Sequence, residues 1–210
     1  MKQNRVFIYS GYLIPLVFWS TIILCGLLTG NYNHLTDLVS ELGATGTKTQ
    51  YIFTAGLILS SALSILFVSG IYTTAKRTGL SLVPVLFILA FSFSISGAAI
   101  FPLPSALHGI LGSSSVLLPL SPLLALILWK ERKISKIKIV SGIVLLIMIL
   151  GFSAFFPDIM GNYPGVKQRF FHIGWTLWFI CLSQRFSELD KKTSEKADCQ
   201  PNESRNTIHP

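Results

Sequence analysis

Histidines, carboxylates and one arginine occupy the short polar segments that separate the long apolar stretches of this chain. They are His34, Asp37, Glu41, His108, Asp158, Arg169 and His172. An imidazole can ligate a metal or carry a proton near neutral pH, a carboxylate can act as a base, and a guanidinium binds carboxylate or phosphate through paired hydrogen bonds. These residue types allow two kinds of chemistry: recognition of a polar headgroup and metal-assisted hydrolysis.

The headgroup hypothesis rests on the segment that begins the last apolar stretch. Arg169 and His172 are three residues apart, so they share one edge of a helix. We expect these two side chains to contact the headgroup of a lipid or other amphiphile in a polar pocket at the outer leaflet. Glu41 or Asp158 would orient the guanidinium through an ion pair, and His108 would complete the pocket. The alternative is that Arg169 only anchors its helix, with the guanidinium extended toward the membrane interface.

The hydrolysis hypothesis requires zinc held by three histidines. Catalytic zinc takes three protein ligands and keeps a position for water, and His34, His108 and His172 could supply them, with Asp158 or Glu41 as the base. Neither HxxxH nor HExxH occurs, so each ligand would come from a different element. Headgroup binding is therefore favoured, with no cofactor expected, no catalytic residue assigned and zinc as the alternative.

The segment from His34 to Leu42 has a helical repeat of apolar residues. Leucine and valine recur at positions 35, 38, 39 and 42, while His34, Asp37 and Glu41 fall on the opposite stripe. The pattern predicts a short amphipathic helix that Gly43 ends. Its polar face would lie on the lipid headgroups or fold over the mouth of the bundle.

Composition places the elements that carry these residues in a membrane. Of the 210 residues, 51% are hydrophobic and only 12% are charged, whereas about a quarter of residues in soluble domains are charged. The net charge of +8 comes from short Lys and Arg clusters between uncharged stretches. Because no single basic face results, nucleic-acid binding is excluded. The three cysteines have neither the spacing of a disulfide framework nor that of a zinc site.

Six stretches are long enough to cross the roughly 30 Å hydrocarbon core as helices. The sequence thus predicts an all-α bundle of six transmembrane helices. Their approximate spans are residues 6–30, 50–75, 79–101, 105–129, 138–157 and 168–187. The two prolines in residues 101–104 separate the third span from the fourth, because proline cannot continue a helix.

Positive charge predicts the orientation of the bundle. Short cytoplasmic loops retain Lys and Arg, and only Lys48, Lys167 and Arg169 fall on the opposite side of the predicted spans. Both termini are therefore expected in the cytoplasm of a multi-pass protein of the cell membrane, the bacterial inner membrane or its equivalent. Residues 187–210 are polar and aromatic-free, which predicts a disordered cytoplasmic tail.

Several motifs resemble those of a known family. They are the segment SELGATG at residues 40–46, Phe101-Pro102 followed by His108-Gly109, and Gln168-Arg169. Over about residues 6–186 the chain resembles a prokaryotic family of six-helix membrane proteins known as a domain of unknown function. The resemblance implies six helices and singles out Glu41, His108 and Arg169. More distantly, the acidic-glycine loop is similar to that of DRAM/FRAG/Sfk membrane proteins, which implies a role in lipid remodelling or organisation.

The chain departs from the family pattern at one position. An acid is expected shortly after Phe101-Pro102, whereas Leu103 and Pro104 stand there. If that acid is catalytic in the family, the same activity is not expected of this chain.

Two further hypotheses concern transport and assembly. Prolines 84, 119 and 122 could break helices as in transporters, yet the inner halves of the predicted helices offer little polar path. The GxxxG spacing of Gly26 and Gly30 allows close helix packing within one chain or between two copies, so a homo-oligomer is a further hypothesis.

Overall fold

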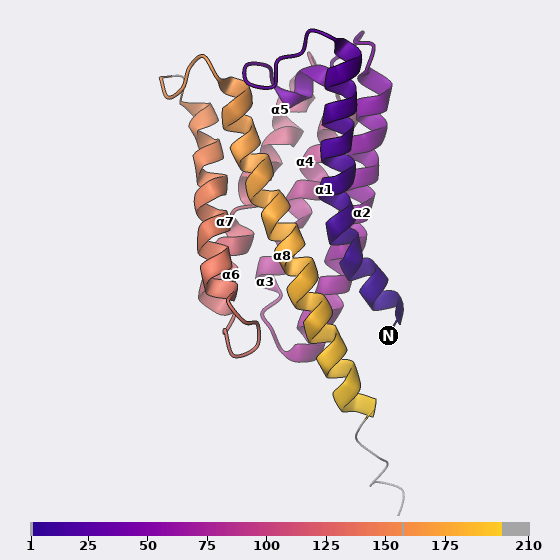
Figure 1. Ribbon diagram of the computed structural model, residues 1–210, viewed down its shortest axis with the longest axis vertical. Helices are drawn as coiled ribbons and strands as arrows, with labels where there is room; N and C mark the ends of the chain where they lie inside the picture. Colours follow the sequence, from indigo (N-terminus) through magenta and orange to yellow (C-terminus); the bar gives the residue numbers. More distant parts are fainter. Residues whose placement is uncertain (1, 157, 199–210) are drawn as a thin grey trace, which may run out of the picture.

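The computed structural model describes residues 2–156 and 158–198, and this part of the chain is all-helical, without strands (Figure 1). The helices form one upright bundle. The elements in chain order are α1 Lys2–Thr29, η1 Val39–Gly43, α2 Gln50–Thr78, α3 Val83–Leu86, α4 Leu89–Ile100, α5 Ala106–Gly112, η2 Ser113–Leu117, α6 Leu120–Leu128, α7 Ile137–Gly151, η3 Phe152–Phe155 and α8 Pro164–Asp198, where η marks a 3₁₀ helix.

Four helical stretches of the described residues are long and apolar enough to cross a membrane. They are Gln3–Thr29, Gln50–Thr78, Val83–Ile100 and Ala106–Leu128. Two of the six predicted spans are absent from this set. Helix α7 is apolar but has only 15 residues, and α8 carries charged residues at both ends of its uncharged middle. The composition is that of an integral membrane protein, whereas the six-span count and the orientation stay predictions.

The third and fourth spans are each built from shorter pieces. Helix α4 ends at Ile100 and α5 begins at Ala106, which confirms the predicted break at the two prolines. Within the third span, Pro84 lies in the first turn of α3, where a missing N–H costs nothing. Within the fourth, Pro119 directly precedes α6. Pro119 thus marks the boundary between η2 and α6, because proline cannot donate the hydrogen bond that a helix interior needs, whereas the break between α3 and α4 at residues 87–88 contains no proline.

The bundle has two ends, which we call upper and lower as they lie in Figure 1. The upper end holds η1, the α4–α5 turn and the α7–α8 connection. The lower end holds the start of α1, the α2–α3 and α6–α7 connections, and the last turns of α8. Helix α8 packs against α1 and α7 and contacts α2, so it links the two halves of the bundle.

Three tryptophans are among the largest buried side chains of the core. Trp129, Trp175 and Trp178 are fully buried. Their apolar rings stabilise the core, while each indole N–H needs an acceptor. Trp129 donates to the Ser81 carbonyl and Trp178 to the Ser121 hydroxyl, both at 2.9 Å. The polar atoms of these rings are therefore satisfied inside an apolar core.

The segment after α1 differs from the predicted amphipathic helix. Only Val39–Gly43 is helical, as the 3₁₀ helix η1. Before it, the Asn33 N–H donates to the Asp37 carboxylate at 2.8 Å, and the Leu35 N–H donates to the Asn33 side chain at 3.0 Å. The prediction over residues 34–42 was wrong because such side-chain bonds to the backbone compete with helical hydrogen bonds.

Helix α8 also continues beyond the predicted end of the last span. The sequence predicts a disordered tail from residue 187, whereas the structure is helical to Asp198. Leu189 packs against the core, and the side chain of Asp190 is fully buried. The average polarity of this segment did not reveal that the buried carboxylate of Asp190 contacts arginines of other helices. Residues 199–210 of the predicted tail lie outside the described residues.

Candidate functional site

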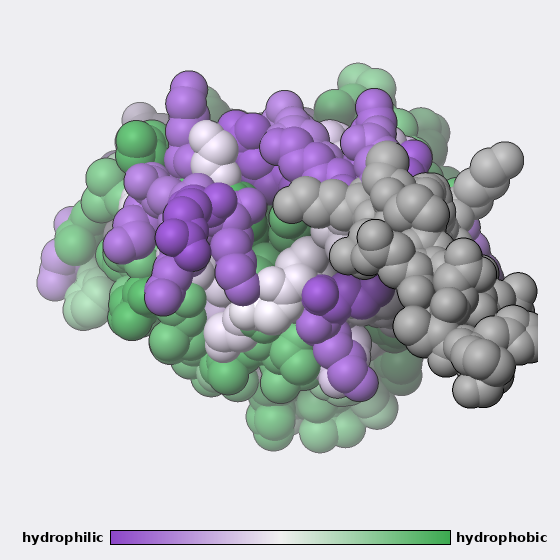
Figure 2. All heavy atoms as spheres, turned by 90° about the horizontal axis from the view of Figure 1, so that it is seen from below, coloured by the Kyte–Doolittle hydropathy of each residue, from purple (hydrophilic) through white to green (hydrophobic). Residues whose placement is uncertain are grey.

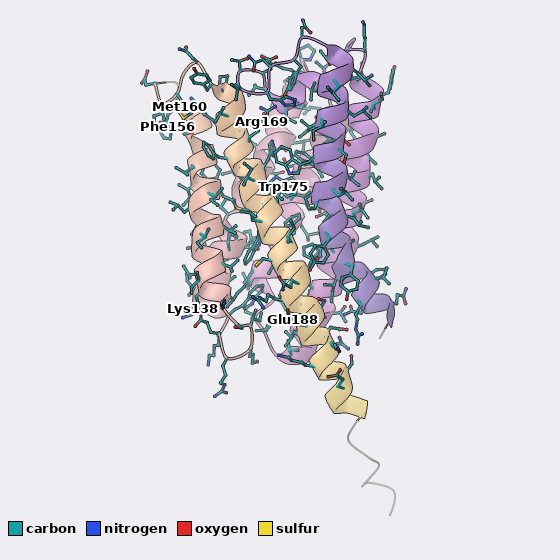
Figure 3. The ribbon with its side chains drawn as sticks, in the orientation of Figure 1. Lys138, Phe156, Met160, Arg169, Trp175 and Glu188 are labelled. Atoms are coloured by element: carbon teal, nitrogen blue, oxygen red, sulfur yellow. The ribbon has the colours of Figure 1, made fainter. Side chains whose placement is uncertain are left out.

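A cavity of about 460 Å³ lies at the upper end and is lined by residues from most helices of the bundle. We call it the upper pocket. Residues 38–40 from the α1–α2 connection line it, together with Phe18 of α1, Phe91 of α4 and Trp175 of α8. The rings of Phe18 and Phe91 lie 4.9 and 4.4 Å from that of Trp175. The pocket therefore has a wall of packed aromatic rings, and Figure 3 places Trp175 in the upper half of α8.

His172 lines the upper pocket and holds an unpaired donor. Its Nδ1 accepts a hydrogen bond from the indole of Trp175 at 3.2 Å. In the neutral imidazole the proton then resides on Nε2, because one ring nitrogen donates while the other accepts. Among the described residues this buried Nε2 has no hydrogen-bond partner. An unsatisfied buried polar group costs about 1–3 kcal/mol, so a ligand oxygen that accepts from it would be favoured.

His108 lines the same pocket in the complementary tautomer. Its Nδ1 lies 2.9 Å from the carbonyl oxygen of Phe101, which can only accept, so Nδ1 is the donor. In the neutral ring Nε2 is then an acceptor. Two of the predicted site residues thus meet at one cavity, where one offers an N–H and the other a nitrogen lone pair.

Three serines of the upper pocket direct their hydroxyls to the backbone. Ser94 and Ser115 both donate to the Gly112 carbonyl, at 2.7 and 2.9 Å, and Ser113 donates to the Ile110 carbonyl at 2.8 Å. In the part of the chain that the structure describes, no serine donates to a histidine. The arrangement therefore lacks the nucleophile–base pair of a serine hydrolase.

Arg169 does not line the upper pocket; it fastens the α1–α2 connection to α8. Its Nη1 donates to the carbonyls of Gly165 and Asp37 at 2.9 and 3.2 Å. Its Nη2 donates to the Tyr32 hydroxyl at 2.8 Å and to His34 Nδ1 at 3.0 Å. The guanidinium carbon also lies 5.7 Å from the centre of the Tyr32 ring, within the range of a cation–π contact. All of these acceptors are neutral.

Glu41 and Asp158 do not orient Arg169 as the sequence predicts. Both residues are exposed, neither lines the upper pocket, and neither forms an ion pair with any described residue. The prediction was wrong because it considered only carboxylate partners, whereas loop carbonyls, a phenol and an imidazole lie closer to the guanidinium.

Two further hydrogen bonds join the α1–α2 connection to α8. The Gln168 side chain accepts from the Val39 N–H at 2.7 Å, and the Val166 N–H donates to the Leu35 carbonyl at 3.1 Å. A side chain at Gly165 would collide with the carbonyls of His34 and Asp37. Glycine is therefore required where this connection crosses the first turn of α8.

The electrostatics of the connection favour a neutral His34 beside a charged Asp37. Desolvation lowers the pKa of His34, and the nearby Arg169 charge lowers it further. The pKa of Asp37 is lowered because the Asn33 N–H and the Thr36 hydroxyl donate to its carboxylate. A neutral His34 can accept the Arg169 hydrogen bond on Nδ1, which agrees with the geometry.

The three histidines proposed as zinc ligands do not form one ligand set. His34 is bound to Arg169 outside the upper pocket, while His108 and His172 line it. Among residues 2–156 and 158–198, no three histidine, cysteine, aspartate or glutamate residues lie close enough together to hold a metal ion.

A known family model matches most of the chain. A model described as "Protein of unknown function (DUF998)" matches residues 12–185. The chain belongs to the DUF998 family. Neither a curated protein nor a solved structure matches it. The family description names no activity, and the comparisons do not confirm the distant similarity to DRAM/FRAG/Sfk proteins, so the function of this DUF998 protein has to be argued from its pocket.

Sequence reasoning missed a second polar cluster, at the lower end. The Asp190 carboxylate is fully buried and forms ion pairs with Arg77 and, at 3.4 Å, with Arg5. It also accepts from the Asn4 side chain at 2.7 Å and from the Thr74 hydroxyl at 3.2 Å. The cluster joins α1, α2 and α8. The signal in the sequence was an aspartate directly before Lys191 and Lys192, which does not identify its partners on other helices.

Proposed function

We propose that this membrane protein binds an amphiphile in the upper pocket, with an oxygen atom of the ligand accepting from His172 Nε2. The observation that carries the proposal is the unpaired donor in a mainly apolar cavity of about 460 Å³. Small-molecule sites typically measure about 300–1,000 Å³ and combine apolar walls with a few polar groups. The upper pocket fits both criteria.

The two histidines favour a ligand with neutral polar atoms. His172 offers a donor for an ester carbonyl, and His108 offers an acceptor for a hydroxyl. A glycerolipid carries both groups next to an acyl chain, and the aromatic wall of Phe18, Phe91 and Trp175 would accommodate that chain. In this proposal Arg169 holds the α1–α2 connection beside the pocket and does not contact the headgroup.

We also propose that α7 and the uncharged middle of α8 complete a six-helix transmembrane bundle with both termini in the cytoplasm. Support comes from the packing of α8 against α1 and α7 along the bundle. The positive charge of the last turn of α2 and of the α6–α7 connection lies at the lower end, which the positive-inside rule assigns to the cytoplasm.

The test compares lipid retained by the detergent-purified wild-type protein with that retained by His172→Phe and His172→Gln. Phenylalanine keeps a ring but removes the N–H, whereas glutamine restores a donor. We expect one glycerolipid species at near-stoichiometric amounts in the wild type and the glutamine variant, and about tenfold less in the phenylalanine variant, as the loss of one hydrogen bond implies. Mass spectrometry of the extracted lipid measures this.

Ile173→Phe is the matched control, because Ile173 is the exposed neighbour of His172 and does not line the pocket. It should retain lipid as the wild type does. Equal retention in all variants would refute the proposed site. Elemental analysis of the same samples and of His108→Ala tests for bound zinc. If the wild type held stoichiometric zinc and the His108 and His172 variants lost it, the hydrolase hypothesis would replace the binding proposal.

A further inference from the structure

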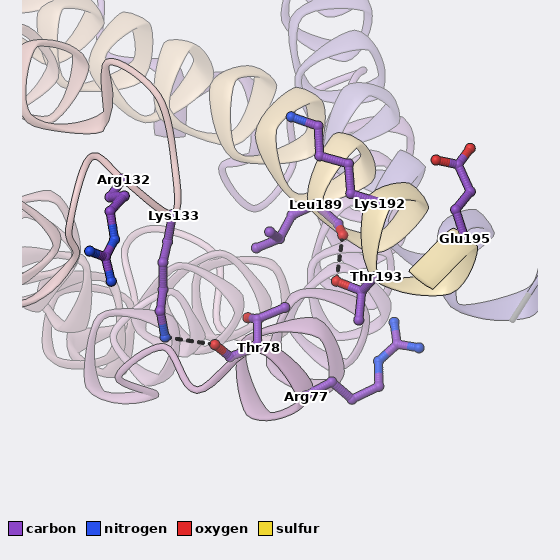
Figure 4. Close-up of a pocket in the computed structure, with 8 residues that line it drawn as sticks. All are labelled: Arg77, Thr78, Arg132, Lys133, Leu189, Lys192, Thr193 and Glu195. Atoms are coloured by element: carbon purple, nitrogen blue, oxygen red, sulfur yellow. Dashed lines mark hydrogen bonds between the residues drawn. The ribbon is translucent and has the colours of Figure 1, made fainter. Parts of the chain in front are cut away.

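A second cavity opens at the lower end, and basic side chains surround it. It measures about 590 Å³ and lies between α2, the α6–α7 connection and α8 (Figure 4). We call it the lower pocket. Arg77, Arg132, Lys133 and Lys192 line it against the single carboxylate of Glu195, and Figure 4 shows Glu195 pointing away from the other labelled side chains. The pocket is therefore strongly positive.

The basic side chains differ in whether they already have partners. Arg77 is paired with Asp190, and Lys133 Nζ donates to the carbonyls of Thr78 and Gly79 at 2.8 and 2.9 Å. In the part of the chain that the structure describes, Arg132 and Lys192 form no ion pair. Two cations from different elements thus line one cavity without an ion-pair partner among the described residues.

The frame around these cations is held together by the Asp190 ion pairs and by two hydrogen bonds from Lys133. Asp190 lies half a turn before Lys192 and fastens α8 to α1 and α2 through Arg5 and Arg77. The bonds from Lys133 fasten the α6–α7 connection to the end of α2. The elements that carry Arg132 and Lys192 are therefore fixed relative to each other before any ligand arrives, which lowers the entropy cost of binding.

We propose that the lower pocket binds a phosphate group, carried by an acidic phospholipid or free in solution. Arginine and lysine are the side chains that bind phosphate oxygens best. Basic pockets between transmembrane helices at the membrane surface bind anionic headgroups. Figure 2 views this end directly and shows hydrophilic residues around a more apolar middle, an arrangement that suits a charged headgroup with an acyl chain below it. The site is independent of the upper pocket.

The experiment measures thermal unfolding of the full chain in a non-ionic detergent with three probes. These are dioctanoyl phosphatidylglycerol, inorganic phosphate and dioctanoylglycerol, which has the acyl chains without phosphate. A ligand that binds only the folded state raises the unfolding temperature. We expect phosphatidylglycerol to stabilise the protein beyond whatever stabilisation dioctanoylglycerol gives by binding the upper pocket. An equal effect of inorganic phosphate would assign the site to free phosphate, and its lack of effect would assign the site to the lipid.

Two double variants of equal charge change decide whether the pocket is responsible. R132Q/K192Q removes the unpaired cations of the pocket, whereas K138Q/K191Q removes two exposed lysines at the same end that do not line it. We expect the half-maximal probe concentration to rise about tenfold or more in the first variant and to stay unchanged in the second. The charge-conserving R132K/K192R variant should keep the response.

Three results would overturn the proposal. Equal weakening in R132Q/K192Q and K138Q/K191Q would show diffuse attraction to a positive surface. Equal stabilisation by dioctanoylglycerol would show that the acyl chains alone are recognised. The absence of stabilisation by both phosphate-bearing probes would show that no such site exists.

Discussion

Helix α8 is joined to the N-terminal part of the chain, which comprises α1, α2 and their connection, by a contact that involves arginine at each end of the bundle. The two contacts differ in their charge balance. At the upper end, Arg169 donates only to neutral acceptors, among them Tyr32 and His34. At the lower end, Arg5 and Arg77 surround the buried carboxylate of Asp190. The first contact holds a connection beside a pocket, whereas the second joins three helices.

This difference indicates how easily each contact can be released. Breaking a buried ion pair leaves an uncompensated charge, which is strongly unfavourable. A guanidinium that loses neutral acceptors keeps its charge but can bind water at the membrane surface instead. We therefore expect the lower end to be a permanent anchor and the upper end to be the adjustable one, as suits a connection that lines a ligand pocket.

The largest effect is expected from Asp190→Asn. This change removes the buried charge and leaves Arg5 and Arg77 without their counter-ion. Loss of a buried partner costs about 3–5 kcal/mol, and the side chains of both arginines are about one-third exposed, so we expect about 3 kcal/mol of unfolding free energy to be lost. Chemical unfolding in detergent, followed by tryptophan fluorescence, measures it.

Glu188→Gln provides the control for that prediction. Glu188 lies on the same helix, its side chain is 47% exposed, and its only ion pair is with Arg185 at 3.4 Å, within the described residues. Surface pairs contribute about 0–1 kcal/mol. If both variants lost the same small amount, Asp190 would not be the anchor.

A smaller effect is expected from Arg169→Met, which keeps the aliphatic part of the side chain but removes the donors. Hydrogen bonds to charged groups contribute about 1.5–3 kcal/mol, and water replaces part of them at this exposed end, so we expect a loss of about 2 kcal/mol. Hydrogen exchange should accelerate in residues 32–43 and stay unchanged around Asp190. Lys48→Gln removes an exposed charge near η1 and should change neither, whereas unchanged exchange in the arginine variant would show that Arg169 does not hold the connection.

The smallest effect is the pH dependence of the same connection. Because the pKa of folded His34 lies below its ordinary value of 6.5, the unfolded chain binds the proton first as the pH falls through that value. The contribution of His34 to stability is therefore complete above about pH 6.5 and decreases below it. Asp37, whose pKa is also lowered, affects stability only at more acidic pH.

The measurement compares unfolding of the wild type and His34→Gln between pH 7.5 and 5.5. The difference between the two proteins isolates His34 from the other histidines. We expect the wild type to lose more stability than the variant over this range. Parallel pH profiles would show that protonation of His34 does not weaken the Arg169 contact.

The candidate site could be predicted from the sequence only in part. His108 and His172 were singled out as polar residues beside apolar stretches, and both line the upper pocket. Glu41 and Asp158 were chosen by the same reasoning, yet both are exposed. Proximity to a membrane surface is visible in a sequence, but whether a side chain points into the bundle or toward water depends on how each helix is rotated.

The sequence by itself determined that this chain forms apolar helices of a membrane protein. The length of an apolar stretch and the position of a proline decide locally where such a helix begins and ends. Only the tertiary structure decided which side chains meet. Asp190 contacts Arg5 and Arg77 across 185 and 113 residues, and His172 faces a pocket built from most of the bundle. Helices that are apolar on nearly every side carry no periodic signal for their rotation, so packing alone set these contacts.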